Sequence, residues 1–140
     1  MPRYEGSREL LAPRQDVWKL IREPFHLRDW WPGIAGVRPD RRGFAPGARW
    51  QVVGDDRPRL FRRPNMTGML VVVAVEEPSR FAFLLTGDRL EAELRLEERG
   101  EDRTLAILSV SGPALIGLRR GLPQRALARL HALCQTAADF

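Results

Sequence analysis

The chain has 140 residues, of which 44% are hydrophobic and 29% charged, and its formal net charge is +5. This length fits one domain over residues 1–140, and the composition excludes a disordered chain, a collagen-like repeat and a disulfide-stapled scaffold. The single Cys134 cannot form an intramolecular disulfide, and no CxxC or HxxxH spacing supplies a zinc site. No stretch approaches the ~18 apolar residues of a membrane span, and the first residues lack a signal-peptide core. We therefore expect a cytoplasmic protein without a metal or other cofactor.

The basic charge comes almost entirely from arginine, since Lys19 is the only lysine among 23 basic residues. A phosphate-binding surface would accept lysine equally often, so this bias indicates coding composition rather than nucleic-acid binding. Residues 57–63 hold four arginines around Phe61, which is the best nucleic-acid signature available. The adjacent Asp55-Asp56 pair and the lack of a binding motif argue against nucleic-acid binding. The same arginines neutralise the charge of the two aspartates, which argues against a metal site at that pair. We expect a solvated loop there, or a lid that carries Phe61.

The first third of the chain predicts a strand followed by two short helices. Residues 3–11 alternate in polarity, which is typical of a half-buried strand. Pro13 can open a helix, because its missing N–H costs nothing in a first turn, and Glu23-Pro24 stops that helix. A second helical turn carries two tryptophans and ends at Pro32-Gly33.

The middle of the chain predicts an antiparallel meander. Strands are expected at residues 34–40 and 48–53, and residues 54–65 have no clear period, so we expect a loop or a frayed edge strand there. Four further strands with turn-rich separators are predicted at residues 66–76, 81–86, 90–97 and 103–111. Apolar and charged residues alternate through 90–97, which places one face in water. Residues 70–75 are apolar throughout, so we expect that strand to be covered on both faces.

The last segment, residues 113–139, predicts a long helix. Its apolar residues recur every three or four positions and form one wide stripe: Leu115, Leu118, Leu122, Ala126, Leu130 and Leu133. Gly121 and Pro123 interrupt this stripe, and an interior proline removes a hydrogen bond, so we expect a kink or a break there.

Four motifs then match a known pattern: the segment LLAPRQDVWKLIREPFHLRDWWPGI, the Pro46-Gly47 turn before Trp50, the hairpin VVVAVEEPSRFAFLL and the amphipathic tail. Together they resemble the START-related polyketide cyclase/dehydrase and lipid-transfer (SRPBCC) superfamily. The opening pattern of that family is filled here by Ala12, Pro13, Val17, Trp18, Pro24, Trp31 and Pro32. The resemblance implies an α+β helix-grip fold: a curved antiparallel sheet of about seven strands, two short helices after the first strand, and a long C-terminal helix across the concave face.

The resemblance also implies a cavity between the sheet and the last helix for an apolar, lipid-like or polyketide-like small molecule. We expect its walls to include Trp30, Trp31, Trp50, Met69, Phe81, Phe83, Leu94, Leu118, Leu122 and Leu130. The ligand would enter between the broken last helix, the turn at residues 30–33 and the loop at 54–65. Two alternatives stay open: a cyclase/dehydrase-like enzyme that uses the same cavity, and a protein-interaction module whose cavity has collapsed.

Side chains suited to catalysis are few. His131 lies at the margin of the apolar stripe and could face the cavity, whereas the charged neighbours of His26 indicate a surface position. Strand alternation sends Arg49 to the face opposite Trp50, so Arg49 points outward if Trp50 points inward. The segment SVSGP lacks the G-x-S-x-G spacing of a nucleophile elbow. We therefore assign no catalytic residue.

Overall fold

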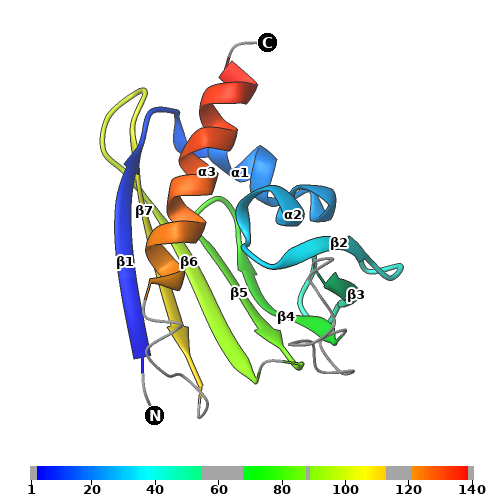
Figure 1. Cartoon of the computed structure of the whole chain (residues 1–140). Coiled ribbons are helices and arrows are strands. Elements are labelled where there is room, and N and C mark those ends of the chain that lie inside the picture. The colour runs from blue at the N-terminus through cyan, green and yellow to red at the C-terminus, as the bar shows by residue number, and fades with distance from the viewer. Residues whose placement is uncertain (1–2, 55–67, 88, 113–120, 139–140) are drawn as a thin grey trace.

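The computed structural model describes residues 3–54, 68–87, 89–112 and 121–138 (Figure 1). Its elements run in the order β1 (Arg3–Leu10), α1 (Arg14–Ile21), the 3-10 helix η1 (Pro24–His26), α2 (Leu27–Trp30), β2 (Ile34–Arg38), β3 (Arg49–Gly54), β4 (Met69–Glu76), β5 (Arg80–Leu85), β6 (Leu90–Glu98), β7 (Thr104–Ser111) and α3 (Leu122–Ala138).

The seven strands form one antiparallel sheet in the order β1-β7-β6-β5-β4-β3-β2. Strands β2 to β7 pair with their chain neighbours, and β1 returns to pair with β7 from Arg3↔Ser111 to Leu10↔Thr104. The register shifts between Val72 and Ala74 in β4, and such a bulge bends and twists a strand. The predicted meander and the α+β helix-grip fold are therefore confirmed.

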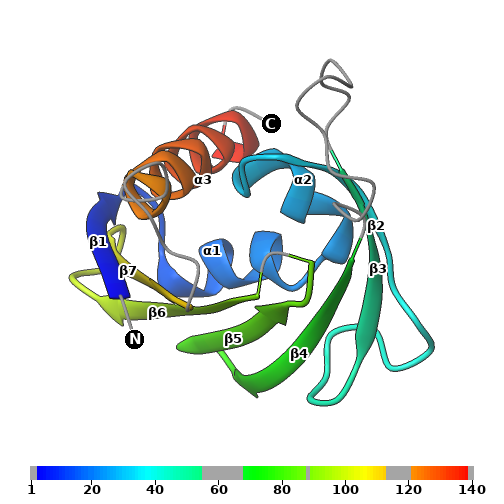
Figure 2. The ribbon, with the colours of Figure 1, turned by 60° about the horizontal axis from the view of Figure 1, so that its bottom comes forward.

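The three helices lie on the concave side of the sheet. Helices α1 and α2 connect β1 to β2, which are the two edge strands of the sheet, and lie on its open concave side (Figure 2). Helix α3 packs against β1 and α2. None of the helices in the described ranges is long and apolar enough to cross a bilayer.

Helix α3 begins at the place where the sequence predicts a kink or a break. Its first residue is Leu122, and the N–H of Arg125 donates to the Gly121 carbonyl at 3.0 Å, which is the first turn of the helix. Pro123 therefore stands in that first turn, and the start of α3 at Leu122 agrees with the predicted break at Gly121 and Pro123. The missing N–H of a proline is harmless there, because first-turn N–H groups have no partner within the helix. The first part of the predicted helix, residues 113–120, lies outside the described residues.

The concave face of the sheet and the inner faces of the helices share one apolar core. The predicted alternation in β6 is confirmed, since Leu90, Ala92, Leu94 and Leu96 are buried and Glu91 and Glu97 are exposed. The expectation that β4 is covered on both faces is wrong, because Val73 is 57% exposed. The helices all lie on the concave side, so the outer face of β4 carries no packed layer within the described residues.

Candidate ligand-binding site

Most of the predicted wall residues come together in the core. The buried ones are Trp30, Trp31, Trp50, Phe81, Phe83, Leu94, Leu122 and Leu130. Met69 is half-buried, and strand alternation places it on the face opposite the buried Leu70, so it lies apart from the others. Leu118 lies outside the described residues.

A continuous series of ring contacts runs through this interior. Its ring centroids are 5.8 Å apart for Trp30–Trp31, 5.2 Å for Trp31–Phe83, 5.0 Å for Phe83–Phe81, 4.6 Å for Phe81–Phe44 and 5.6 Å for Phe44–Trp18. Phe44 lies between the interior rings and Trp18. The sequence does not indicate this role, because Phe44 stands in a turn between Gly43 and Gly47, and the helical spacing of Trp18 predicts a core position in the first helix.

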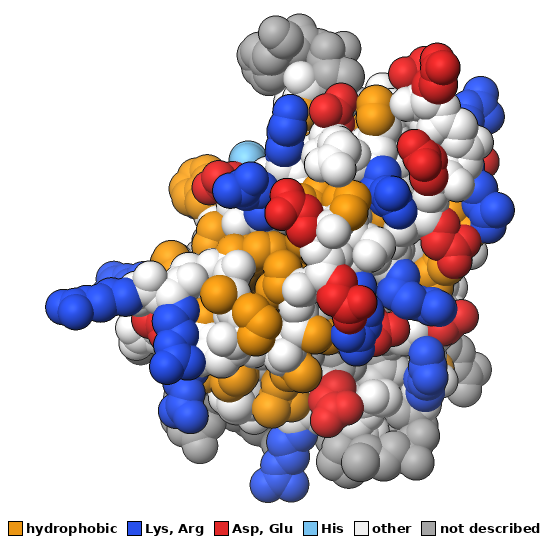
Figure 3. All heavy atoms as spheres, turned by 180° about the vertical axis from the view of Figure 1, so that it is seen from behind, with side chains coloured by type: hydrophobic (Ala, Val, Ile, Leu, Met, Phe, Trp, Pro, Cys, Tyr) orange, Lys and Arg blue, Asp and Glu red, His pale blue; other side chains and the backbone are white. Residues whose placement is uncertain are grey.

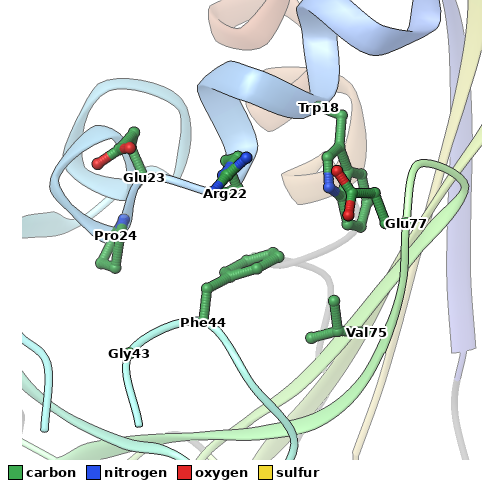
Figure 4. A pocket seen from close by; sticks show the side chains of 8 residues that line it. All are labelled: Trp18, Arg22, Glu23, Pro24, Gly43, Phe44, Val75 and Glu77. Atoms are coloured by element: carbon green, nitrogen blue, oxygen red, sulfur yellow. The ribbon is translucent and has the colours of Figure 1, made fainter. Parts of the chain in front are cut away.

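A pocket of about 310 Å³ opens on the outer side of these last two rings. It lies where the end of α1 and η1 meet the loop after β2 and the end of β4. Its lining residues are Trp18, Arg22, Glu23, Pro24, Gly43, Phe44, Val75 and Glu77 (Figure 4).

Helix α1 supplies one wall of the pocket. Trp18 and Arg22 are four residues apart and so lie on the same face of the helix, where the Arg22 N–H donates to the Trp18 carbonyl at 2.8 Å. Arg22 ends the helix, and Pro24 starts η1. The sequence Arg22-Glu23-Pro24 thus turns the chain around the pocket.

The loop between β2 and β3 supplies the opposite wall, and hydrogen bonds fix it. The Asp40 carboxylate accepts the backbone N–H groups of Arg42 and Arg49, each at 3.0 Å. These bonds hold the pKa of Asp40 below its ordinary value, with the Arg49 N–H as the main cause. The Trp50 indole N–H donates to the Gly43 carbonyl at 2.6 Å, so the residue before Phe44 is tied to the core.

The pocket combines aromatic walls with a few polar groups. Trp18 is only 2% exposed, and its indole N–H forms no hydrogen bond with the described residues, so it remains a donor at the pocket wall. Arg22 adds a guanidinium, and Glu23 and Glu77 add two carboxylates. Figure 4 shows Glu77 on the same side of the pocket as Trp18, away from Glu23 and Pro24. The site can therefore stack a ring and hydrogen-bond an oxygen.

The histidines considered from the sequence do not line this pocket. The His26 Nδ1 lies 3.1 Å from an Asp29 carboxylate oxygen, beside the exposed ring of Phe25. His131 is half-buried on α3. Arg49 is exposed while Trp50 is buried, which confirms their predicted opposite orientation. In the described part of the chain, no three His, Cys, Asp or Glu side chains gather in a way that could hold a metal ion.

Solved structures share this fold across nearly the whole chain. XoxI from Bacillus cereus superposes with a TM-score of 0.74 at 15% identity, with 99% of each chain covered. CalU16 from Micromonospora echinospora gives 0.65 at 20% identity, covering 96% of this chain and 76% of its own. DynU16, from the dynemicin biosynthetic locus, gives 0.70 at 18% identity, covering 96% of this chain and 48% of its own. At such low sequence identity, the structural similarity shows a shared fold and nothing about function.

The comparison with curated proteins found no match. The comparison with family models found one that spans residues 1–135 and carries the description polyketide cyclase / dehydrase and lipid transport. The match covers β1, both short helices, the whole meander and nearly all of α3. The chain therefore belongs to the polyketide cyclase/dehydrase and lipid transport family.

Proposed function

We propose that this protein binds a small, planar, neutral aromatic molecule that carries a hydroxyl or keto oxygen, in the pocket beside Trp18 and Phe44. The observation that carries the proposal is the pocket of about 310 Å³ walled by these two rings. This volume lies within the range of small-molecule sites, roughly 300–1,000 Å³. Burial of the ligand ring supplies most of the affinity, at about 25 cal/mol per Å² before ordering costs.

The polar groups select the ligand's oxygen. A hydroxyl can accept a hydrogen bond from the indole N–H of Trp18, which has no partner among the described residues, and donate one to the Glu77 carboxylate. The lining holds two carboxylates and one guanidinium, so its net charge is negative. Such a lining repels an anionic ligand and suits a neutral one. Polyketides are rich in ring-borne keto and hydroxyl oxygens, and this chemistry agrees with the family description.

The interior residues chosen from the sequence remain a prediction. Phe44 separates them from the pocket, and its ring contacts Phe81 and Trp50 on the inner side. A ligand larger than the pocket would reach Trp50 and Trp30 only if Phe44 moved aside. Variants Trp50→Phe and Trp30→Phe should therefore affect long ligands and leave small ones unchanged.

The proposed setting is the cytoplasm. Burial raises the pKa of the single cysteine, Cys134, to about 11, so the thiol is protected and neutral near pH 7. A chain with no possible intramolecular disulfide fits a reducing compartment.

Titration calorimetry with 2-naphthol tests the proposal. We expect one saturable site per chain and about tenfold weaker binding of 2-methylnaphthalene, which keeps the rings and loses the hydroxyl. Trp18→Phe keeps a ring and removes the N–H donor, so the ratio of the affinities for 2-naphthol and 2-methylnaphthalene should fall several-fold. Glu77→Gln should act in the same direction, and 2-naphthoate should bind less tightly than 2-naphthol.

Two further variants make the test specific. Phe44→Ala removes a pocket wall and should lower the affinity for both neutral ligands by tenfold or more. Glu98→Gln changes an exposed carboxylate of β6 outside the pocket and should change nothing. The proposal is contradicted if no saturable binding is seen, or if neither Trp18→Phe nor Phe44→Ala changes the affinity.

A further inference from the structure

The convex face of the sheet divides into an ionic half and an apolar half. On the ionic half, Arg80 donates to Glu93 at 2.8 Å and to Glu76 at 2.6 Å. Ser109 donates to Glu5 at 2.7 Å, and this bond is the main reason that the pKa of Glu5 is lowered. These charged groups are satisfied within the chain.

The apolar half lies over β3, β4 and β5. Val73 is 57% and Val53 41% exposed, and Val71 and Leu84 are half-exposed on the same face. Figure 3 shows hydrophobic side chains gathered in the middle of this face, with basic groups at one side and mixed charges at the other. Exposed branched apolar side chains on adjacent strands are typical of an interaction surface.

One cross-strand row of this face is self-complementary. The pairings Arg49↔Val71, Val71↔Leu84 and Leu84↔Glu91 place four residues side by side on β3, β4, β5 and β6. The row reads positive, apolar, apolar, negative. Within the described residues, neither Arg49 nor Glu91 forms an ion pair.

We infer that this face binds a second copy of the chain about a two-fold axis that runs parallel to the strands between β4 and β5. Rotation about this axis keeps the height along the strands and reverses the order across them. Val71 of one copy then lies over Leu84 of the partner, and Arg49 lies over the partner's Glu91. The charge pattern thus commits the surface to its own copy, because each contact occurs twice with opposite charges facing.

The curvature of the sheet fits this arrangement. Two convex faces touch along a line at β4 and β5 and diverge on either side, where short side chains lose contact. Stacked sheets lie about 10 Å apart, and the flanking positions here carry long side chains, arginine and glutamate, which can bridge the wider gap. The contact area is small, so we expect a weak dimer with a Kd on the order of 10 μM.

Sedimentation velocity over a range of concentrations tests the inference by charge reversal. The wild-type chain should dimerise, whereas Arg49→Glu and Glu91→Arg alone should each raise the Kd tenfold or more, because like charges then face each other twice. The double variant R49E/E91R should restore dimerisation. An equimolar mixture of the two single variants should also dimerise, since both of its cross-contacts pair opposite charges.

Val73→Asp and Arg129→Glu complete the design. Val73→Asp places a charge on the contact line and should weaken the dimer, while Arg129→Glu reverses an exposed charge on α3, on the far side of the molecule, and should have no effect. A chain that stays monomeric at all concentrations overturns the inference. The inference is also overturned if the single charge reversals leave the dimer Kd unchanged, or if the equimolar mixture of the two single variants does not dimerise.

Discussion

At the scale of single residues, Asp40 shows how one exposed side chain positions a pocket wall. Its carboxylate accepts the backbone N–H of Arg42, in the loop that carries Phe44, and that of Arg49, the first residue of β3. The sequence placed Asp40 at the end of a strand and a turn after it. It could not show that the loop folds back so that Arg49, nine residues on, donates to the same carboxylate, because that contact depends on the pairing of β2 with β3.

Replacing Asp40 with Asn should lower the free energy of unfolding at neutral pH. The folded-state pKa of Asp40 lies below the ordinary value of 3.8, so its stabilisation is fully present above that value and is lost as the pH falls through the folded-state pKa. The difference between wild type and Asp40→Asn should therefore be constant from about pH 7 to about pH 5 and shrink below pH 3.8. Urea unfolding across this range measures it.

Asp102→Asn provides the matched control. Asp102 is exposed in the turn between β6 and β7 and forms no hydrogen bond or ion pair with other described residues. Its replacement should give no such pH-dependent difference. Equal pH profiles for Asp40→Asn and Asp102→Asn would show that the loop contacts of Asp40 do not stabilise the fold.

At the scale of elements, the start of α3 is fixed by close packing on β1. A Cβ at Gly6 would lie 3.1 Å from the Pro123 Cβ and 3.0 Å from the Gln124 Nε2. The Gln124 side chain can move, whereas the proline ring is held in the first turn of the helix. The sequence predicts the break at Gly121 and Pro123, but it cannot show that the proline ring packs on a glycine of the first strand.

Gly6→Val should destabilise the protein by about 1–3 kcal/mol, because the added methyl groups push α3 away from β1. The neighbouring substitution Ser7→Val lies on the exposed face of the same strand and should change stability by less than about 0.5 kcal/mol. The two free energies of unfolding can be compared by urea denaturation. If both variants unfold at the same urea concentration, the close approach of α3 to Gly6 is not a packing constraint.

At the scale of the whole molecule, the proposed pocket and the proposed dimer face lie on different sides of the structure. The pocket lies between helix α1 and the loop after β2, and the dimer face is the outer surface of β4 and β5. Glu91→Arg should therefore raise the dimer Kd tenfold or more and leave the affinity for 2-naphthol within about twofold of wild type. Calorimetry on the variant at a concentration where it is monomeric measures this. A tenfold loss of affinity would show that the two sites are coupled.

The sequence by itself determined the order of the elements, the antiparallel meander and the family, because the periods of two and of three to four residues and the turn motifs are local properties. It also identified most of the buried aromatic residues, because large apolar side chains are mostly buried whatever the details of the fold. The tertiary structure alone decided that Phe44 divides the interior from an outer pocket, that Pro123 packs on Gly6, and that Arg49, Val71, Leu84 and Glu91 form one row. These features depend on register and on the curvature of the sheet, which bring together residues distant in the chain.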